Sequence, residues 1–117
     1  MIKRRPSVAG YFYPSNSKEL LQEIEEYMPT TLKIDAFGAI CPHAGYVYSG
    51  SVAGAVYSKL KPKEIFILIG PNHTGYGENV ALMTEGEWEI PLGSIKIHSE
   101  LAKKIIEKSP LAKDDIH

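Results

Sequence analysis

The chain has 117 residues, of which 44% are hydrophobic and 23% are charged, the size and composition of one globular domain. Its formal net charge of −1 excludes the strongly basic surface that nucleic-acid binding requires. A single cysteine excludes an internal disulfide framework, and no apolar run approaches the roughly 20 residues that span a bilayer. We therefore predict a cytoplasmic protein with neither a nucleic-acid nor a membrane partner.

The first part of the chain is predicted to form an extended arm followed by one helix. Residues 4–14 contain two prolines, a glycine and three consecutive aromatic residues, which favours an extended arm packed on the body. Apolar side chains then recur at helical spacing from Leu20 to Met28, and Pro29 ends this pattern. Ser15 and Ser17 are both candidate N-caps of the predicted helix.

Two continuous apolar runs predict buried parallel strands at residues 36–41 and 64–70. A helix predicted over residues 49–60 connects them into a right-handed βαβ unit. Weaker patterns predict three further strands and a helix, at residues 80–83, 88–93, 94–97 and 99–108. Ser99 is the expected N-cap of that last helix. The predicted fold class is α/β, with a mostly parallel sheet flanked by helices.

The motifs that carry chemistry lie where the two predicted parallel strands end. His43 follows the first of these strands and His73 follows the second. Ligands bind beyond the carboxyl ends of the strands in open parallel sheets, and neighbouring strands lie about 4.8 Å apart. The two imidazoles are therefore expected to converge on one atom, and neutral imidazole is the commonest metal ligand. An ordinary loop role for each histidine remains the alternative.

Polar residues near these two loops are candidate ligand contacts. The N–H groups at the start of the helix predicted near Ser49 would favour an anion, and Arg5 is a candidate partner for the same charge. The complete candidate ligand-binding set is Arg5, Tyr46, Tyr48, Ser49 and Asn72. Cys41 is expected to be a small core residue rather than a ligand, whereas His98 and His117 receive no functional role. No glycine-rich phosphate loop is present, so no nucleotide cofactor is expected.

Three motifs, in this order along the chain, carry a resemblance to a known family. They are Arg5-Pro-Ser-Val-Ala-Gly-Tyr-Phe-Tyr-Pro14, Pro42-His-Ala-Gly-Tyr-Val-Tyr-Ser-Gly50 and Gly70-Pro-Asn-His73. Together they resemble the Memo family. The resemblance covers essentially the whole chain but less than half of a typical family member. It implies that residues 1–117 are the N-terminal portion of a single Memo-like α/β domain.

The resemblance also implies a fold similar to class III extradiol ring-cleaving dioxygenases, which are non-haem iron enzymes. It implies that His43 and His73 correspond to two of the family's metal-site residues. The implied metal is iron or copper, with zinc less favoured. The family's other site residues, a later histidine and a cysteine, have no counterpart in this chain, and Cys41 is not that cysteine. Family members in animals have also been linked to the binding of phosphorylated peptides.

Two functions follow as hypotheses. The leading one is a Memo-like protein with a metal site at the carboxyl ends of the strands and a redox or dioxygenase-related activity. The alternative is a non-catalytic binding module that captures a phosphorylated or other anionic ligand in the same pocket. The expected partner is therefore a small molecule or a peptide, and whether the protein is an enzyme stays open. Unpaired sheet edges also predict self-association.

Overall fold

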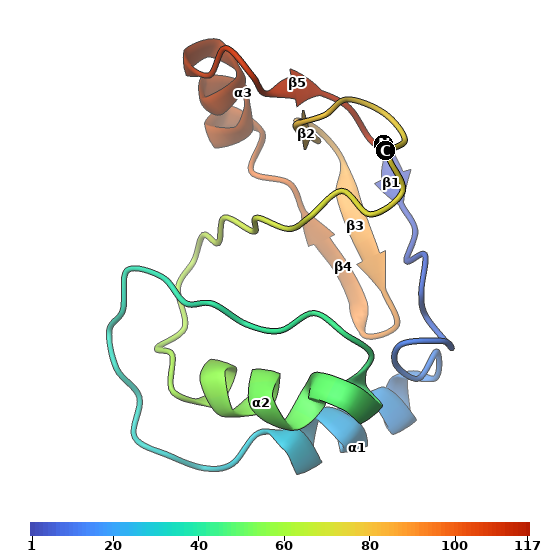
Figure 1. Cartoon of the computed structure of the whole chain (residues 1–117), viewed down its shortest axis with the longest axis vertical. Helices are drawn as coiled ribbons and strands as arrows, with labels where there is room; N and C mark the ends of the chain where they lie inside the picture. Colours follow the sequence, from blue (N-terminus) through green and yellow to red (C-terminus); the bar gives the residue numbers. More distant parts are fainter. The chain divides into compact units, whose positions relative to one another are not determined.

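The computed structural model describes all residues from Met1 to His117, and the chain divides into two compact units. One unit, which we call the helical unit, comprises residues Ser7–Glu64. The other, which we call the sheet unit, comprises Met1–Pro6 together with Ile65–His117. Figure 1 traces both along the chain, with α1 and α2 in blue and green and the strands labelled. The α/β class predicted from the sequence is confirmed.

The helical unit contains α1 (Ser17–Tyr27) and α2 (Tyr46–Ser58). Asn16 is the N-cap of α1, and its side-chain oxygen accepts a hydrogen bond from Glu19 N at 3.1 Å. The prediction of Ser15 or Ser17 as the cap was therefore wrong, because the asparagine between them has the extended backbone and the acceptor that a cap needs. The helix ends at Tyr27 with Met28 as its C-cap, directly before Pro29, as predicted.

Close packing between α1 and α2 depends on two buried glycines of α2. The ring of Tyr27 lies where a Cβ on Gly50 would be placed, and the backbone of Tyr27 lies where a Cβ on Gly54 would be placed. A larger residue at either position would push the helices apart. α2 carries no charged side chain over its length and begins at Tyr46, three residues before the predicted start. Apolar contact therefore holds the helical unit together, with Leu20 of α1 buried in it.

The predicted extended arm forms something different. Residues Lys3–Arg4 form the short strand β1, whereas the chain from Val8 to Tyr13 folds into a tight turn. In this turn Val8 O accepts hydrogen bonds from Tyr11 N at 3.0 Å and from Phe12 N at 2.9 Å. Gly10 makes the turn possible because its φ of +84° lies in the left-handed region. Gly10, which was one of the signs of an extended arm, instead lies at the centre of a turn.

The sheet unit consists of two small sheets and one helix. Its elements are β1, β2 (Ala81–Leu82), β3 (Glu87–Ile90), β4 (Gly93–Lys96), α3 (Ser99–Lys108) and β5 (Lys113–Asp114). The three-stranded sheet has the order β1-β3-β4, in which β1 is parallel and β4 antiparallel to β3. The second sheet pairs β2 with β5 in parallel. The predicted strand at residues 94–97 corresponds to β4, which is the second arm of an antiparallel hairpin with β3.

Small side chains and one sulfur–indole contact form the core of the sheet unit. Met83, Thr84, Ala102 and Ala112 are buried, and Trp88 Nε1 donates to the Met83 sulfur at 3.2 Å. The helix predicted at residues 99–108 is confirmed, but its N-cap is His98 rather than Ser99. The Nδ1 atom of His98 accepts from Leu101 N at 3.1 Å. The imidazole of His98 thus caps α3, a role that was expected from the sequence for the Ser99 hydroxyl.

The two apolar runs predicted as central parallel strands, residues 36–41 and 64–70, do not form strands. Both lack regular secondary structure and are mostly exposed, and Ile69 reaches 94% exposure. The parallel pairings in the helical unit are two isolated bridges, one between Ala9 and Tyr13 and one between Ile34 and Leu60. An apolar β-branched run becomes a strand only when a partner strand completes its hydrogen bonds, and neither run has one. The predicted central βαβ unit was therefore wrong for this chain.

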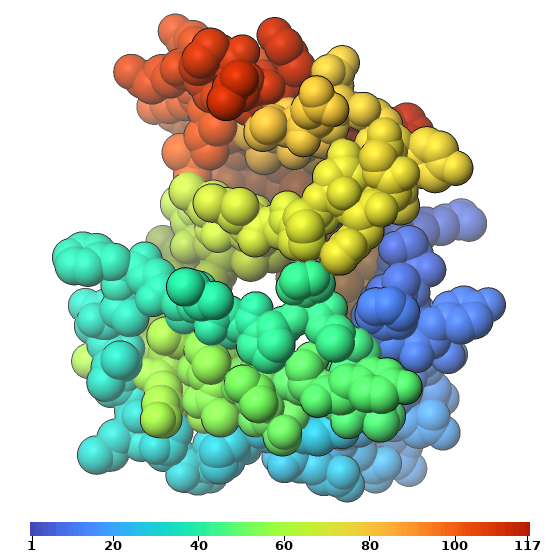
Figure 2. All heavy atoms as spheres, in the orientation of Figure 1, coloured from blue at the N-terminus to red at the C-terminus, as the bar shows by residue number.

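An apolar pocket opens beside α2 within the helical unit. It has a volume of about 320 Å³, and its walls include Ile34, Ala36, Val52, Val56 and Leu60. Figure 2 shows the teal spheres of the chain around residues 30–40 standing beside the green spheres of α2, with a hollow between them.

None of the three helices combines the length and the apolar composition needed to cross a bilayer.

Candidate functional site

The first candidate loop contains His43 and leads directly into α2. Gly45 is the N-cap of α2 and has no side chain to offer, so backbone groups position the helix start. Tyr46 N donates to Phe12 O at 2.8 Å, which ties the helix start to the turn at residues 8–13. Ser49 Oγ donates to Ala44 O at 3.2 Å and so closes the loop from within the first helical turn. His43 itself lies on the exposed part of this loop.

Tyr46 is the best-packed candidate residue of this first loop. Its ring lies 5.6 Å from the ring of Tyr13 and 6.2 Å from the ring of Tyr27, the second in an edge-on arrangement. Burial raises the pKa of the Tyr46 hydroxyl, with smaller contributions from Tyr13 and Glu23. Tyr46 is therefore neutral at physiological pH and contributes to packing. Tyr48, by contrast, is 86% exposed and is available to a ligand.

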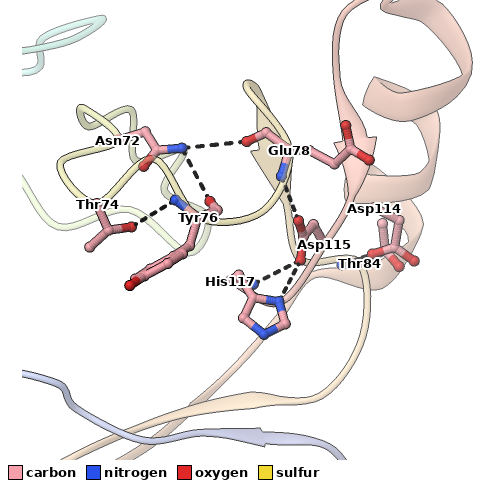
Figure 3. Close-up of polar contacts among 8 residues, drawn as sticks. All are labelled: Asn72, Thr74, Tyr76, Glu78, Thr84, Asp114, Asp115 and His117. Atoms are coloured by element: carbon pink, nitrogen blue, oxygen red, sulfur yellow. Dashed lines mark hydrogen bonds and ion pairs between the residues drawn. The ribbon is translucent and has the colours of Figure 1, made fainter.

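The second candidate loop, residues 70–78, contains His73 and belongs to the sheet unit. Its backbone is held by side chains, as Figure 3 shows. Asn72 Oδ1 accepts from Gly75 N at 2.9 Å, and Thr74 Oγ1 accepts from Tyr76 N at 3.1 Å. The residues on both sides of His73 therefore close the loop on itself. Gly75 has a φ of +72°, which a residue with a Cβ rarely adopts.

A carboxylate from the far end of the chain holds the end of this loop. Asp115 Oδ2 accepts from Glu78 N at 2.7 Å, although the two residues are 37 positions apart. Asp115 Oδ1 accepts from His117 N at 3.0 Å and contacts His117 Nδ1 at 2.9 Å (Figure 3). Hydrogen bonds from the backbone N–H groups of His117 and Glu78, and then from the His117 ring, lower the pKa of Asp115 to about 2. Asp115 is therefore fully ionised near neutral pH.

Arg5 lies in the sheet unit, beside the edge of β3. Its Nε is 3.9 Å from Glu89 Oε2, and its side chain is 89% exposed. Lys3 lies nearer to the same carboxylates, 3.2 Å from Glu87 and 3.6 Å from Glu89. These acidic partners raise the pKa of Lys3, first through the hydrogen bond with Glu87. Arg5 is thus a loosely paired surface cation.

The predicted site residues fall into two groups, one in each unit. His43, Tyr46, Tyr48 and Ser49 lie at the start of α2 in the helical unit. Arg5, Asn72 and His73 lie in the sheet unit. Convergence of the two imidazoles on one atom stays a prediction. Both histidines lie in loops, but these loops do not follow strands as expected, because the two predicted strands are absent.

The chain offers imidazole donors of the type that metal ions prefer, but it gathers no complete ligand set. No group of three or more His, Cys, Asp or Glu side chains is placed to hold a metal ion. Cys41 is half-buried beside Tyr57; burial raises the pKa of that tyrosine, and Cys41 adds to the rise. The donor chemistry of His43 and His73 therefore suits a metal only if further ligands join them.

Sequence reasoning missed the residue that fixes the second loop. Asp115 lies in a polar stretch with no motif, and nothing in the sequence links it to Glu78. The spacing Asp-x-His at Asp115 and His117 is a signal in retrospect, because a carboxylate two residues before a histidine can reach its Nδ1. The side chain of Asn72 shapes the loop, and its contact with a ligand stays a prediction.

These observations define an α/β protein with two histidine-bearing loops, each fixed by its own unit. The family model described as "Memo-like protein" matches residues 4–117, which is nearly the whole chain. The chain belongs to the Memo family, so the family predicted from the three motifs is confirmed.

Named relatives support the same assignment. A MEMO1 family protein of Pyrobaculum aerophilum is 44% identical over 131 residues, covering 100% of this chain and 46% of the relative. A MEMO1 family protein of Methanosarcina acetivorans is 48% identical over 105 residues, covering 87% of this chain and 39% of the relative. A MEMO1 family protein of Thermotoga petrophila is 38% identical over 130 residues, covering 97% of this chain and 47% of the relative. The chain thus spans less than half the length of the relatives that it matches.

Proposed function

We propose that this chain contributes two imidazole ligands, His43 and His73, to a metal site of a Memo-family protein. The observation that carries the proposal is that both histidines sit in family motifs and in loops with defined backbone restraints. The His43 loop is closed by Ser49 and by the bond from Tyr46 N to Phe12 O. The His73 loop is closed by Asn72 and Asp115. Preorganised loops of this kind lower the entropic cost of binding an ion.

The proposed site is completed by ligands from outside this chain. A metal bound by two histidines needs at least one further donor, and the chain groups no third one with them. The part of each relative beyond the match is longer than the match itself, so it has room for these donors. We propose iron or copper as the metal, in an architecture related to class III extradiol dioxygenases. When bound, such a metal would supply redox chemistry.

The experiment that tests this proposal is metal titration of a full-length Memo-family protein that contains this chain, so that the further ligands are present. Fe(II), Cu and Zn are titrated under reducing conditions, and metal content is measured by elemental analysis. His43→Ala and His73→Ala are expected to lose the bound metal while keeping the helical circular dichroism signal. His98→Asn is the matched control, because it removes an imidazole but leaves an acceptor that can cap α3. Unchanged metal content in both alanine variants would sink the proposal.

A second candidate function is capture of an anion, such as a phosphorylated ligand, at the start of α2. The observation in its favour is that α2 begins without a side-chain cap and without an acidic residue in its first turn. The exposed hydroxyl of Tyr48 is close in sequence to these N–H groups. Phosphotyrosine added to metal-free protein should then shift the amide signals of residues 46–49. Absence of any shift at millimolar phosphotyrosine contradicts this function.

A further inference from the structure

We propose that Asp115 is the positioning residue for His73, acting through the backbone of the loop at residues 72–78. The inference rests on the proposed function, because the position of His73 matters only if its imidazole contacts a metal or another ligand. No family motif contains Asp115, and it lies 42 positions after His73 in the sequence. What connects them is the hydrogen bond from Glu78 N to the Asp115 carboxylate, at 2.7 Å.

The loop is restrained at its beginning and at its end. Near its beginning, Asn72 Oδ1 accepts from Gly75 N at 2.9 Å, so the chain folds back directly after His73. The amide nitrogen of Asn72 also points to Tyr76 O and Glu78 O, at longer distances of 3.4 and 3.5 Å. At the end of the loop, Asp115 is the acceptor that holds Glu78 (Figure 3). Loss of Asp115 would remove this restraint from the end of the loop.

Asp115 is itself firmly placed, which a positioning residue requires. It follows β5, and its own N–H donates to Leu82 O at 3.2 Å, so the β2–β5 pairing fixes its backbone. Its second carboxylate oxygen is held by the N–H and the ring of His117. The side chain is only 13% exposed. Hydrogen bonds from N–H groups to an ionised carboxylate are roughly twice as strong as those between neutral groups.

Gly77 explains how the carboxylate reaches the loop. A Cβ at this position would overlap Asp115 Oδ2 and would lie 2.9 Å from the Cβ of His117. The φ of Gly77 is +72°, so the backbone here also favours a glycine. The loop therefore carries a glycine at the point where Asp115 approaches it. Gly77→Ala should push the loop away from Asp115 while leaving the carboxylate itself in the protein.

The adjacent residue Asp114 provides a matched control. Its Oδ1 accepts from the backbone N–H of Thr84 at 3.2 Å, so it has the same chemistry as Asp115 but holds a different segment (Figure 3). Asp115→Ala is expected to speed hydrogen exchange of the Glu78 amide at least tenfold and to shift the ring signals of His73 in NMR spectra. Asp114→Ala should speed exchange at Thr84 and leave both Glu78 and His73 unchanged.

Metal affinity then connects positioning to function. Loss of a residue that orients a metal ligand typically weakens metal binding by about 10- to 100-fold. We expect this loss of Fe(II) affinity in Asp115→Ala and in Gly77→Ala, but not in Asp114→Ala. Asp115→Asn, which keeps the shape and one acceptor oxygen, should lie between them. If Asp115→Ala does not fold, Gly77→Ala provides the same test.

The outcomes separate this inference from the metal proposal. Unchanged Glu78 exchange and unchanged His73 ring signals in Asp115→Ala and Gly77→Ala overturn the positioning role, whatever the wild-type chain binds. Equal effects in Asp114→Ala also overturn it, because they would show general loosening of the sheet unit. If wild-type protein binds no metal but the His73 signals still move only in Asp115→Ala and Gly77→Ala, the positioning role stands and the metal proposal fails.

Discussion

The two histidine-bearing loops are held in contrasting ways. The loop of His43 owes its position to the start of α2, which one backbone bond ties to Phe12 and which packs on α1 through glycines. The loop of His73 has no helix next to it and is held by the side chains of Asn72, Thr74 and Asp115. Packing on α1 and one hydrogen bond from Ser49 restrain the first loop, whereas several polar side chains restrain the second. The first should therefore respond to changes in volume and the second to changes in charge.

The largest effect on the free energy of unfolding is expected from Gly54→Ala, which disrupts the packing of α1 on α2 in the helical unit. The added Cβ would overlap the backbone of Tyr27, which cannot rotate away, so α1 and α2 must separate. Overpacking of this kind costs about 1–3 kcal/mol, although alanine regains about 1 kcal/mol of helix propensity. We expect a lower free energy of unfolding in urea and altered amide signals in the His43 loop.

Gly38→Ala is the matched control for that experiment. Nothing lies within 4 Å of a Cβ at this position, so the free energy of unfolding should change by less than about 0.5 kcal/mol. The His73 loop should keep its amide signals in both variants. A Gly54→Ala protein more stable than wild type would show that glycine packing does not hold the helical unit.

The second prediction concerns acid and should affect the His73 loop alone. The pKa of Asp115 is about 2 in the folded protein, below its usual value of 3.8. A carboxyl group with a lowered folded pKa stabilises the native state above its unfolded pKa, and this contribution is lost as pH falls through the folded value. We therefore expect the Glu78 amide signal to move as the pH falls through about 2, while the Tyr46 amide, bonded to Phe12 O, does not.

Asp115→Asn should abolish this acid response, because the amide side chain has no proton to gain in this range. NMR spectra recorded at several pH values would follow both amides in one sample. If the Tyr46 amide moves with the same midpoint as Glu78, the two loops respond together and the contrast between them is lost.

A feature of the fold could be predicted from the sequence where it depends on residues that are close together in the chain. Helical periodicity correctly predicted α3 and most of α1, because the pattern and the structure both extend over a few turns. The caps were missed because Asn16 stands between two serines of similar capping propensity, whereas His98 is not a residue type that N-cap preferences would favour over Ser99. The runs at residues 36–41 and 64–70 have strand composition, but a strand depends on a partner that composition does not reveal.

The candidate site likewise has local features that the sequence predicted and long-range features that it did not. The motifs identified His43 and His73 directly, and the structure shows both in loops with defined backbone contacts. What holds the second loop could not be predicted, because the Asp115–Glu78 bond spans 37 residues and follows from the pairing of β2 with β5. Tyr46 was predicted as a ligand contact, yet its ring packs between Tyr13 and Tyr27.

The smallest effect is expected at Arg5, where charge contributes little to the fold. Its side chain is 89% exposed and 3.9 Å from Glu89, and exposed ion pairs contribute at most about 1 kcal/mol. Arg5→Ala should therefore change the free energy of unfolding by less than about 0.5 kcal/mol. Lys3→Ala is the comparison. Lys3 lies closer than Arg5 to these carboxylates, at Glu87 and Glu89, so its loss should lower the free energy of unfolding slightly more.

Because Arg5→Ala leaves the fold intact, it also gives a clean test of anion binding. Weaker phosphotyrosine binding in this variant would then reflect a lost contact with the ligand rather than a damaged sheet unit. Charge on the sheet unit would in that case act twice, at Asp115 to hold a loop and at Arg5 to attract a ligand. Equal phosphotyrosine affinity in wild type and Arg5→Ala, measured by titration calorimetry, would leave Arg5 as a solvated surface cation.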